Sequence, residues 1–345
     1  MAHSSSMLRW LVGGVLALSM GCHRAEPVAE EERPAAIPRG YDGTIHPRLL
    51  KRFAPIPAQG FGIGDGEKVS LLGQKLFFDA RLSKERDLSC ASCHDIANGG
   101  TDRRPGHVVT GWRDAPTVLN AAGAFVQGWD GRAMNVEDHA LVPLLGAKAM
   151  NMGKEAAVEA RLHQLPGYEP LFREAFPDDP HPVRAANVGR AIGAYERQLA
   201  TPGRWDRFLA GEKTALTPPE KEGLRTFLAV GCMVCHTGPL VGGTMFERAG
   251  VVEPWPDQSD PGRMTITKSE ADRMMFKVPT LRNVTRTAPY FHDASAATLP
   301  EAVRKMGKHQ LGIDLTDREV EAITTWLGSL DGDVPATLAM RPDLP

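Results

Sequence analysis

The chain has 345 residues, of which 42% are hydrophobic and 24% charged. This composition is typical of a soluble globular protein with two ordinary domains, and it argues against a disordered or multi-spanning membrane protein. Lys and Arg number 40 against 42 for Asp and Glu, so there is no basic excess to bind a phosphate backbone. We therefore expect no nucleic-acid partner.

The beginning of the chain has the pattern of an export signal. Residues 10–21 are apolar, follow Arg9 and are too few to span a bilayer, so we expect a signal peptide over residues 1–21 and a periplasmic location. Cys22 comes next and is a candidate for lipid attachment. Secretion without a lipid and a buried N-terminal helix are the alternatives. Residues 22–45 contain many Glu, Pro and Ala and are expected to form a tether.

The rest of the chain is predicted to be mainly α-helical, because runs of alternating β-branched residues are scarce. Residues 183–199 place Val188, Ile192, Tyr195 and Leu199 on one helical face. The Thr-Pro-Gly at 201–203 then marks a boundary between one domain at 46–200 and another at 201–345. Three capping boxes predict helix starts in the second domain. They are Thr217 with Glu220, Thr298 with Glu301, and Thr316 with Glu319.

Two CxxCH motifs account for the other four cysteines. They are Cys90-Ala91-Ser92-Cys93-His94 and Cys232-Met233-Val234-Cys235-His236. A covalent c-type haem needs two thiols one helical turn apart for its two vinyl groups and an adjacent histidine for the iron. A redox dithiol or a zinc site requires neither histidine. We therefore expect two c-type haems, with a disulfide or a zinc site as the alternatives.

Two haems in one chain suggest unlike sites, and a thioether ligand raises the potential of a haem. The sulfur candidates after the second motif are Met245, Met264, Met274, Met275 and Met306. Met306 lies on the helix that is predicted to begin at Thr298, and core packing is the alternative explanation for it.

Six further segments carry a resemblance to a known family. With the two CxxCH motifs, they resemble the bacterial diheme cytochrome c peroxidases, which include the MauG-type diheme oxidases. That architecture implies a mainly α fold in which two cytochrome-c-like haem domains pack across a shared interface. The segments are LGQKLFFDARLS (72–83), CASCHDIANGGTD (90–102), APTVLNAA (115–122), WDGRA (129–133), VPTLRN (278–283) and TAPYFHD (287–293).

The resemblance assigns the haem ligands. It implies that His94 is the proximal ligand of a lower-potential haem that reacts with peroxide, and that His236 and Met306 are the axial ligands of a higher-potential haem. Trp129 matches the family's tryptophan between the haems, where it would offer an electron path. A buried core aromatic is the other explanation for Trp129.

A calcium ion is also implied by the resemblance. Asp114 and the carbonyl groups of Thr287 and Pro289 match the family's calcium positions. Asp114 stands where Asn is usual, and a carboxylate is at least as good a ligand for this hard cation.

The sequence departs from the family around the first haem. Thr110 stands where a loop histidine that can bind the first iron is expected, and His107, three residues earlier, is the candidate to replace it. The family's Gln, ten residues beyond the tryptophan, is His139 here, and its Glu, twenty beyond, is Ala149. His139, with Glu137 two residues before it, could supply the acid–base group that peroxide cleavage needs. His139 as an iron ligand and His139 without a chemical role are the alternatives.

We therefore expect an exported diheme peroxidase that reduces hydrogen peroxide to water. Its electrons would enter at the Met306 haem from a small cytochrome c or cupredoxin. One alternative is a MauG-like oxidase of a protein or organic donor, although those enzymes have tyrosine in place of the methionine ligand. The other is a non-enzymatic electron carrier or redox sensor whose first haem is capped by His139 or His107. Family members are often homodimers, and a dimer is a further expectation.

Overall fold

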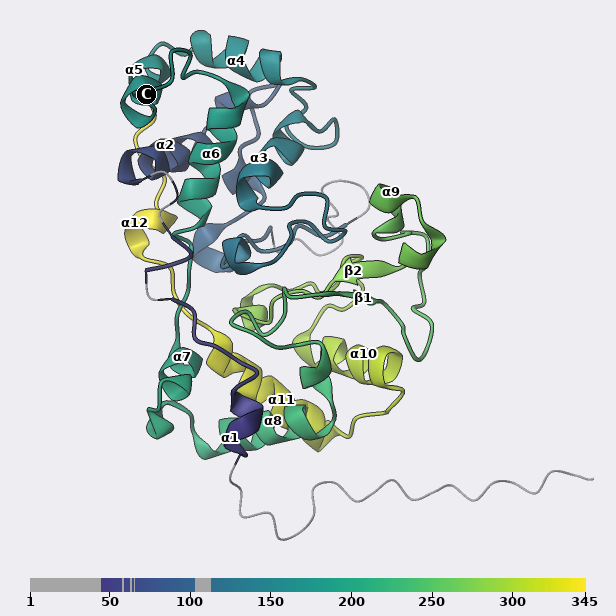
Figure 1. The fold of residues 1–345 in the computed structure, drawn as a ribbon. Helices are drawn as coiled ribbons and strands as arrows, with labels where there is room; N and C mark the ends of the chain where they lie inside the picture. The colour runs from purple at the N-terminus through teal and green to yellow at the C-terminus, as the bar shows by residue number, and fades with distance from the viewer. Residues whose placement is uncertain (1–44, 58, 63, 65, 103–112) are drawn as a thin grey trace, which may run out of the picture. The chain divides into compact units, whose positions relative to one another are not determined.

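The computed structural model describes residues 45–345, except residues 58, 63, 65 and 103–112. The predicted signal peptide, Cys22, nearly all of the tether, His107 and Thr110 lie outside the described residues. The described part is mostly helical, as expected (Figure 1). No helix within it is long and apolar enough to cross a membrane.

The helices are joined by long irregular connections, and one two-stranded antiparallel sheet is formed by β1 (Phe246–Arg248) and β2 (Met275–Lys277). Two single 3₁₀ turns, η2 (Cys90–Ser92) and η6 (Cys232–Val234), each begin at the first cysteine of a CxxCH motif and end just before the second. The α-helices are α1 (Pro47–Leu50), α2 (Glu67–Phe78), α3 (Val136–Leu145), α4 (Glu155–His163), α5 (Tyr168–Ala175), α6 (Ala185–Glu196), α7 (Arg204–Leu209), α8 (Pro218–Ala229), α9 (Met264–Thr267), α10 (Leu299–Leu311), α11 (Asp317–Leu327) and α12 (Ala336–Ala339).

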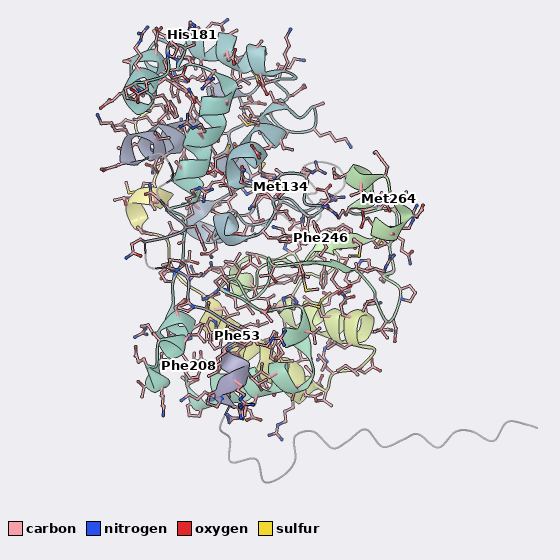
Figure 2. All side chains as sticks on the ribbon, in the orientation of Figure 1. Phe53, Met134, His181, Phe208, Phe246 and Met264 are labelled. Atoms are coloured by element: carbon pink, nitrogen blue, oxygen red, sulfur yellow. The ribbon has the colours of Figure 1, made fainter. Side chains whose placement is uncertain are left out.

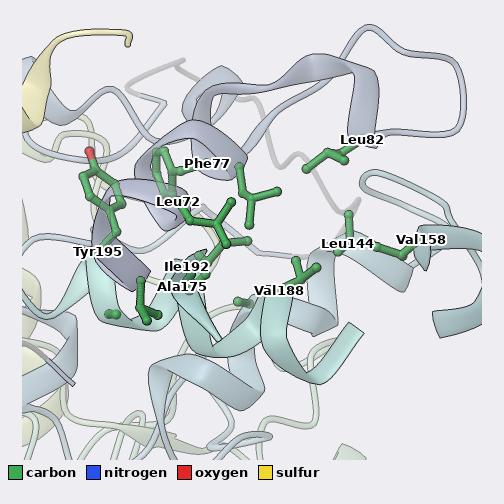
Figure 3. Close-up of a cluster of buried hydrophobic side chains, with 14 of the residues drawn as sticks. Leu72, Phe77, Leu82, Leu144, Val158, Ala175, Val188, Ile192 and Tyr195 are labelled. Atoms are coloured by element: carbon green, nitrogen blue, oxygen red, sulfur yellow. The ribbon is translucent and has the colours of Figure 1, made fainter. Parts of the chain in front are cut away.

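The first hydrophobic core lies among α2, α3, α4, α5 and α6. Leu72 and Phe77 of α2 pack with Ile192 and Tyr195 of α6 in this core (Figure 3). At Gly73 the two helices approach so closely that a Cβ atom would lie 1.8 Å from the carbonyl oxygen of Ala191. Glycine is therefore required at this crossing, because any larger residue would push α2 away from α6.

The second core repeats this arrangement with α8 and α11. A Cβ atom on Gly223 of α8 would lie 1.9 Å from the carbonyl oxygen of Ala322 of α11. Trp326 of α11 is fully buried and contacts both Trp205 and Phe227, with ring centroids 5.5 and 4.4 Å apart. Each core thus contains a helix that precedes a CxxCH motif and crosses a later helix at a glycine.

Each end of the described chain packs against the core that is formed mainly by the other half of the chain. Phe53 belongs to the second core, where its ring lies 5.4 Å from that of Trp205 (Figure 2). At the other end, α12 lies beside α2 and α6 (Figure 1), and Tyr195 donates a hydrogen bond to the carbonyl oxygen of Leu338 at 2.6 Å. Gln74 of α2 donates to the carbonyl oxygen of Thr337 at 2.8 Å. A division of the chain at residue 200 would assign Phe53 to the first core and α12 to the second. Each of them instead packs against the other core.

The predicted helix caps are found with one difference. The capping boxes that begin at Thr217 and Thr316 are both confirmed. At Thr298 the hydroxyl accepts from the backbone N–H of Glu301 at 3.4 Å, but the Glu301 carboxylate accepts from Ala297 at 2.9 Å. The reciprocal bond is therefore made one residue earlier, and this box is only half formed. The helix predicted over 183–199 is observed as α6, a little shorter, with all four predicted core residues buried.

A small third cluster lies next to the strand pair. Trp255, Met274 and Phe276 form its buried centre, and Trp129 and Met306 pack against it. In this cluster Trp129, from the first half of the chain, packs against residues from the second half. Trp129, Trp255, Phe276 and Met306 of this cluster line the cavity described below.

Candidate functional site

The first CxxCH motif is built around a histidine with a fixed orientation. The backbone N–H of His94 donates to the carbonyl oxygen of Cys90 at 2.9 Å, and the ring Nδ1 donates to the carbonyl oxygen of Gly100 at 3.0 Å. Burial lowers the pKa of His94, so the ring is held neutral. A neutral imidazole that donates from Nδ1 carries its lone pair on Nε2, which is the form that binds a metal.

The second motif has the same arrangement. His236 donates from Nδ1 to the carbonyl oxygen of Val241 at 3.2 Å, and its backbone N–H donates to Cys232 at 3.1 Å. Burial lowers the pKa of His236 to about 4. Both histidines therefore present Nε2 as a metal ligand, and both are oriented by a backbone carbonyl a few residues later in the chain.

The four thiols form no disulfide bond within the described part of the chain. Burial raises the pKa of Cys90 and of Cys232 to about 12, so these thiols stay protonated. A reactive dithiol or a thiolate metal ligand has a lowered pKa instead. Among residues 45–345, leaving aside the undescribed positions, no group of three or more His, Cys, Asp or Glu side chains could hold a metal ion. The thiols thus fit covalent attachment of haem better than a thiolate-based site.

A large, mostly apolar cavity of about 390 Å³ adjoins the second motif. Its size is within the range of small-molecule and cofactor sites. Cys232, Cys235 and His236 line it from one motif, and Met306 of α10 lines it as well. The other sulfur candidates, Met245, Met264, Met274 and Met275, are absent from the lining. The structure therefore brings Met306 to the same cavity as His236. Cys90, Cys93 and His94 do not line it.

Trp129 also lines this cavity and is held at both its backbone and its ring. Its indole N–H donates to the carbonyl oxygen of Asp114 at 2.9 Å, and its own carbonyl oxygen accepts from the backbone N–H of Lys277 at 2.8 Å. Because Trp129 packs in the same cluster as Met306, the ring connects the second motif's cavity to the WDGRA loop.

Asp114 has the features expected of a cation ligand. Its side chain is buried, and Oδ1 has no hydrogen-bond partner in the described structure. Burial and the nearby charge of Asp102 raise the pKa of Asp114 to about 7. Thr287 and Pro289 line the same cavity as Asp114. An orphaned buried carboxylate oxygen in the same cavity as the two predicted carbonyl ligands fits a bound calcium ion.

His139 is on α3 and lies close to the WDGRA loop. Its Nε2 is 3.6 Å from the position that a Cβ atom on Gly128 would occupy. Burial, followed by the positive charge of Lys277 and electrostatic interactions with His94 and Arg132, lowers the pKa of His139 to about 4. The ring is therefore neutral at physiological pH, and His94 is near enough to act on it.

The structure does not bring Glu137 to His139 as a partner. Both carboxylate oxygens of Glu137 accept from Arg197, at 2.6 and 3.0 Å, and this ion pair joins α3 to the end of α6. Glu137 is also not among the charged groups that shift the pKa of His139. The side chain thus stabilises the packing of the two helices.

Sequence reasoning missed Lys277. It lines the cavity, and its charge acts on His139. Its position directly before the VPTLRN segment (278–283) was the available sequence signal. That position does not reveal that the lysine is half-buried at a cavity, because its burial depends on tertiary packing.

Comparison with protein families matches residues 67–214 to the di-haem cytochrome c peroxidases. The chain is 42% identical over 270 residues to cytochrome c551 peroxidase from Nitrosomonas europaea, which covers 76% of this chain and 80% of the relative. The chain belongs to the di-haem cytochrome c peroxidase family. It is also 39% identical over 313 residues to the cytochrome c551 peroxidase of Pseudomonas aeruginosa, covering 87% of this chain and 90% of that one. Family membership implies an oxidoreductase with two c-type haems and hydrogen peroxide as substrate.

The fold agrees with this assignment. A crystal structure of a MauG-like protein associated with microbial copper homeostasis superposes with a TM-score of 0.70 at 26% identity. The match covers 83% of this chain and 95% of the other. The mainly α fold and the family predicted from the sequence are thus confirmed.

Proposed function

We propose that this protein is an exported diheme peroxidase that reduces hydrogen peroxide to water with electrons from a small cytochrome c or cupredoxin. The observation that carries the proposal is the pair of complete CxxCH motifs, in each of which a backbone carbonyl orients the histidine for metal binding. The two cores would then be two cytochrome-c-like haem domains. Export, lipid attachment at Cys22 and homodimer formation stay predictions from the sequence.

The residues divide into two haem sites. Cys90, Cys93 and His94 would hold the first haem. Cys232, Cys235, His236 and Met306 would hold the second. When bound, the haems supply the redox chemistry that breaks the O–O bond and stores the incoming electrons.

His139 is the residue that would move the proton. Reduction of one peroxide to two waters takes up two electrons and two protons, and cleavage needs a proton shifted from one oxygen to the other. The neutral ring of His139 can accept the first proton and donate it to the departing oxygen, whereas Ala149 has no group that could do so. Glu137 is held in an ion pair with Arg197, so it is not the partner of His139 in proton transfer.

Trp129 and Asp114 would support this chemistry from between the two sites. Trp129 is fixed through its ring and its backbone, so it offers a rigid aromatic contact for electron transfer. Within the described residues, Asp114 accepts no hydrogen bond at Oδ1, and it would bind calcium there together with the carbonyl oxygens of Thr287 and Pro289. Because the Trp129 indole donates to the Asp114 carbonyl, the calcium site and the tryptophan are mechanically linked.

A second candidate function is favoured by the same property of His139. A neutral imidazole is also the form that binds iron, so His139 could cap the first haem and leave a diheme carrier or redox sensor. A MauG-like oxidase is the third candidate, supported by the structural neighbour and opposed by Met306, which stands where those enzymes have tyrosine.

Two measurements on the holoprotein separate these functions. An optical and EPR spectrum of the half-reduced protein should show high-spin iron at an open first haem. Addition of peroxide with a reduced small cytochrome should then oxidise that cytochrome. A purely low-spin spectrum without cytochrome oxidation would support the capped carrier and refute the peroxidase.

A further inference from the structure

Lys277 is a cationic residue that the proposed reaction does not use. It is the last residue of β2, which lies beside β1 (Figure 1), and it pairs in register with Phe246 of β1. Its backbone N–H donates to the carbonyl oxygen of Trp129 at 2.8 Å. Lys277 is therefore fixed at the junction of the strand pair and the WDGRA loop.

The side chain of Lys277 lines the cavity of the second motif, together with His236 and Met306. Burial is the one cause that lowers the pKa of this amine, to about 8, and no neighbouring carboxylate acts against it. Within the described part of the chain, the ammonium group has neither an ion pair nor a hydrogen bond to another residue.

Two arginines with little exposed side chain in the described part of the chain are paired. Arg282 donates to both carboxylate oxygens of Asp206, at 2.9 and 2.8 Å. Arg113 contacts Asp130 and Asp260, each at 2.6 Å. A cation that leaves water without a counter-ion loses hydration that nothing replaces, so buried charges are normally paired. The partner missing from Lys277 is therefore an anion that enters the cavity.

The proposed occupant of the cavity supplies such an anion. The proposed occupant is the second haem, and its two propionate groups are carboxylates on the porphyrin edge away from the thioether bonds. We propose that Lys277 binds a propionate of the second haem and thereby positions that haem beside Trp129. This inference rests on the proposed placement of the second haem.

A bound ammonium group also has an electrostatic consequence. Positive charge near a haem stabilises the state with one more electron, so it raises the reduction potential. A propionate of the first haem is the alternative partner for Lys277, because the charge of Lys277 also lowers the pKa of His139. The potentials of the two haems distinguish these sources.

The test uses the full-length holoprotein without peroxide, so a failed peroxidase assay does not affect it. The variants are Lys277→Gln, Lys277→Arg and, as a matched control, Lys308→Gln. Lys308 is on the same helix as Met306 but is exposed, with its ammonium group 3.8 Å from Glu253. Haem content is assayed first, and each haem's potential is then measured by an optical redox titration.

We expect Lys277→Gln to lower the potential of the second haem, while Lys277→Arg and Lys308→Gln stay close to the unaltered protein. Loss of the second haem from Lys277→Gln but not from Lys277→Arg would equally support the ion pair. Unchanged potentials in Lys277→Gln would overturn the inference, as would a shift confined to the first haem. Loss of the second haem from both Lys277 variants would show a packing role and also overturn it.

Discussion

Replacing His139 by alanine tests the acid–base role most sharply. The structure places His139 beside Gly128 in a site where burial lowers its pKa to about 4. At pH 7, only about one ring in a thousand is then protonated, three pH units above the pKa. Nearly every molecule is therefore ready to accept a proton from peroxide, and the substitution removes that capacity without removing a charge.

The expected loss follows from the usual contribution of a positioned acid–base group. His139→Ala should slow peroxide reduction by about 10²–10⁴-fold, which corresponds to about 3–5 kcal/mol of transition-state stabilisation. The pH profile has a definite sign. Because the pKa of His139 is lowered, the rate should hold as the pH falls from 7 to 5 and decline as it passes below about 4, where the ring becomes protonated. The alanine variant should lack this decline.

The assay is stopped-flow reaction of the half-reduced holoprotein with peroxide, with haem content and spin state measured on the same samples. His163→Ala is a suitable control, because His163 is an exposed histidine on α4. The double variant His139→Gln with Ala149→Glu rebuilds the family pattern and should recover the rate. A faster reaction of His139→Ala, with low-spin iron converted to high-spin, would refute the acid–base role and identify His139 as an iron ligand. No change in either quantity would refute both roles.

Four further predictions concern the other sites. Replacing Cys232 and Cys235 by alanine should leave one covalent haem per chain instead of two, as a haem-content assay will show. Met306→His should lower the potential of the second haem in a redox titration, because imidazole stabilises ferric iron more than a thioether does. Asp114→Ala should abolish calcium binding in metal analysis of the purified protein, and calcium affinity of the unaltered protein should fall as the pH drops below about 7, where Asp114 becomes protonated. Arg282→Met should destabilise the fold by about 3–5 kcal/mol in denaturant unfolding, because it leaves a buried carboxylate unpaired.

Features with a local cause could be predicted from the sequence. The capping boxes at Thr217 and Thr316 form as predicted, because each depends on residues three positions apart. The apolar face of α6 also follows from its own helical spacing. The CxxCH motifs could be recognised because all of their functional residues lie within five consecutive positions. One carbonyl oxygen a few residues later in the chain then orients each histidine.

Features that depend on distant contacts could not be predicted. The pairing of Glu137 with Arg197 joins two helices whose crossing is decided by packing. The packing of each chain end against the other half's core involves residues far apart in the sequence, such as Tyr195 with Leu338. Lys277 likewise becomes a half-buried cation at the cavity only because the strand pair and the WDGRA loop meet around it.

The central claim is that this protein reduces hydrogen peroxide with electrons held by its own two haems. An anaerobic titration of the fully reduced holoprotein with peroxide, followed optically, tests it most directly. The account predicts rapid oxidation of both haems with an end point at one peroxide per chain, because each peroxide takes two electrons. Haems that remain reduced after excess peroxide, or that oxidise only slowly and without a stoichiometric end point, would contradict it.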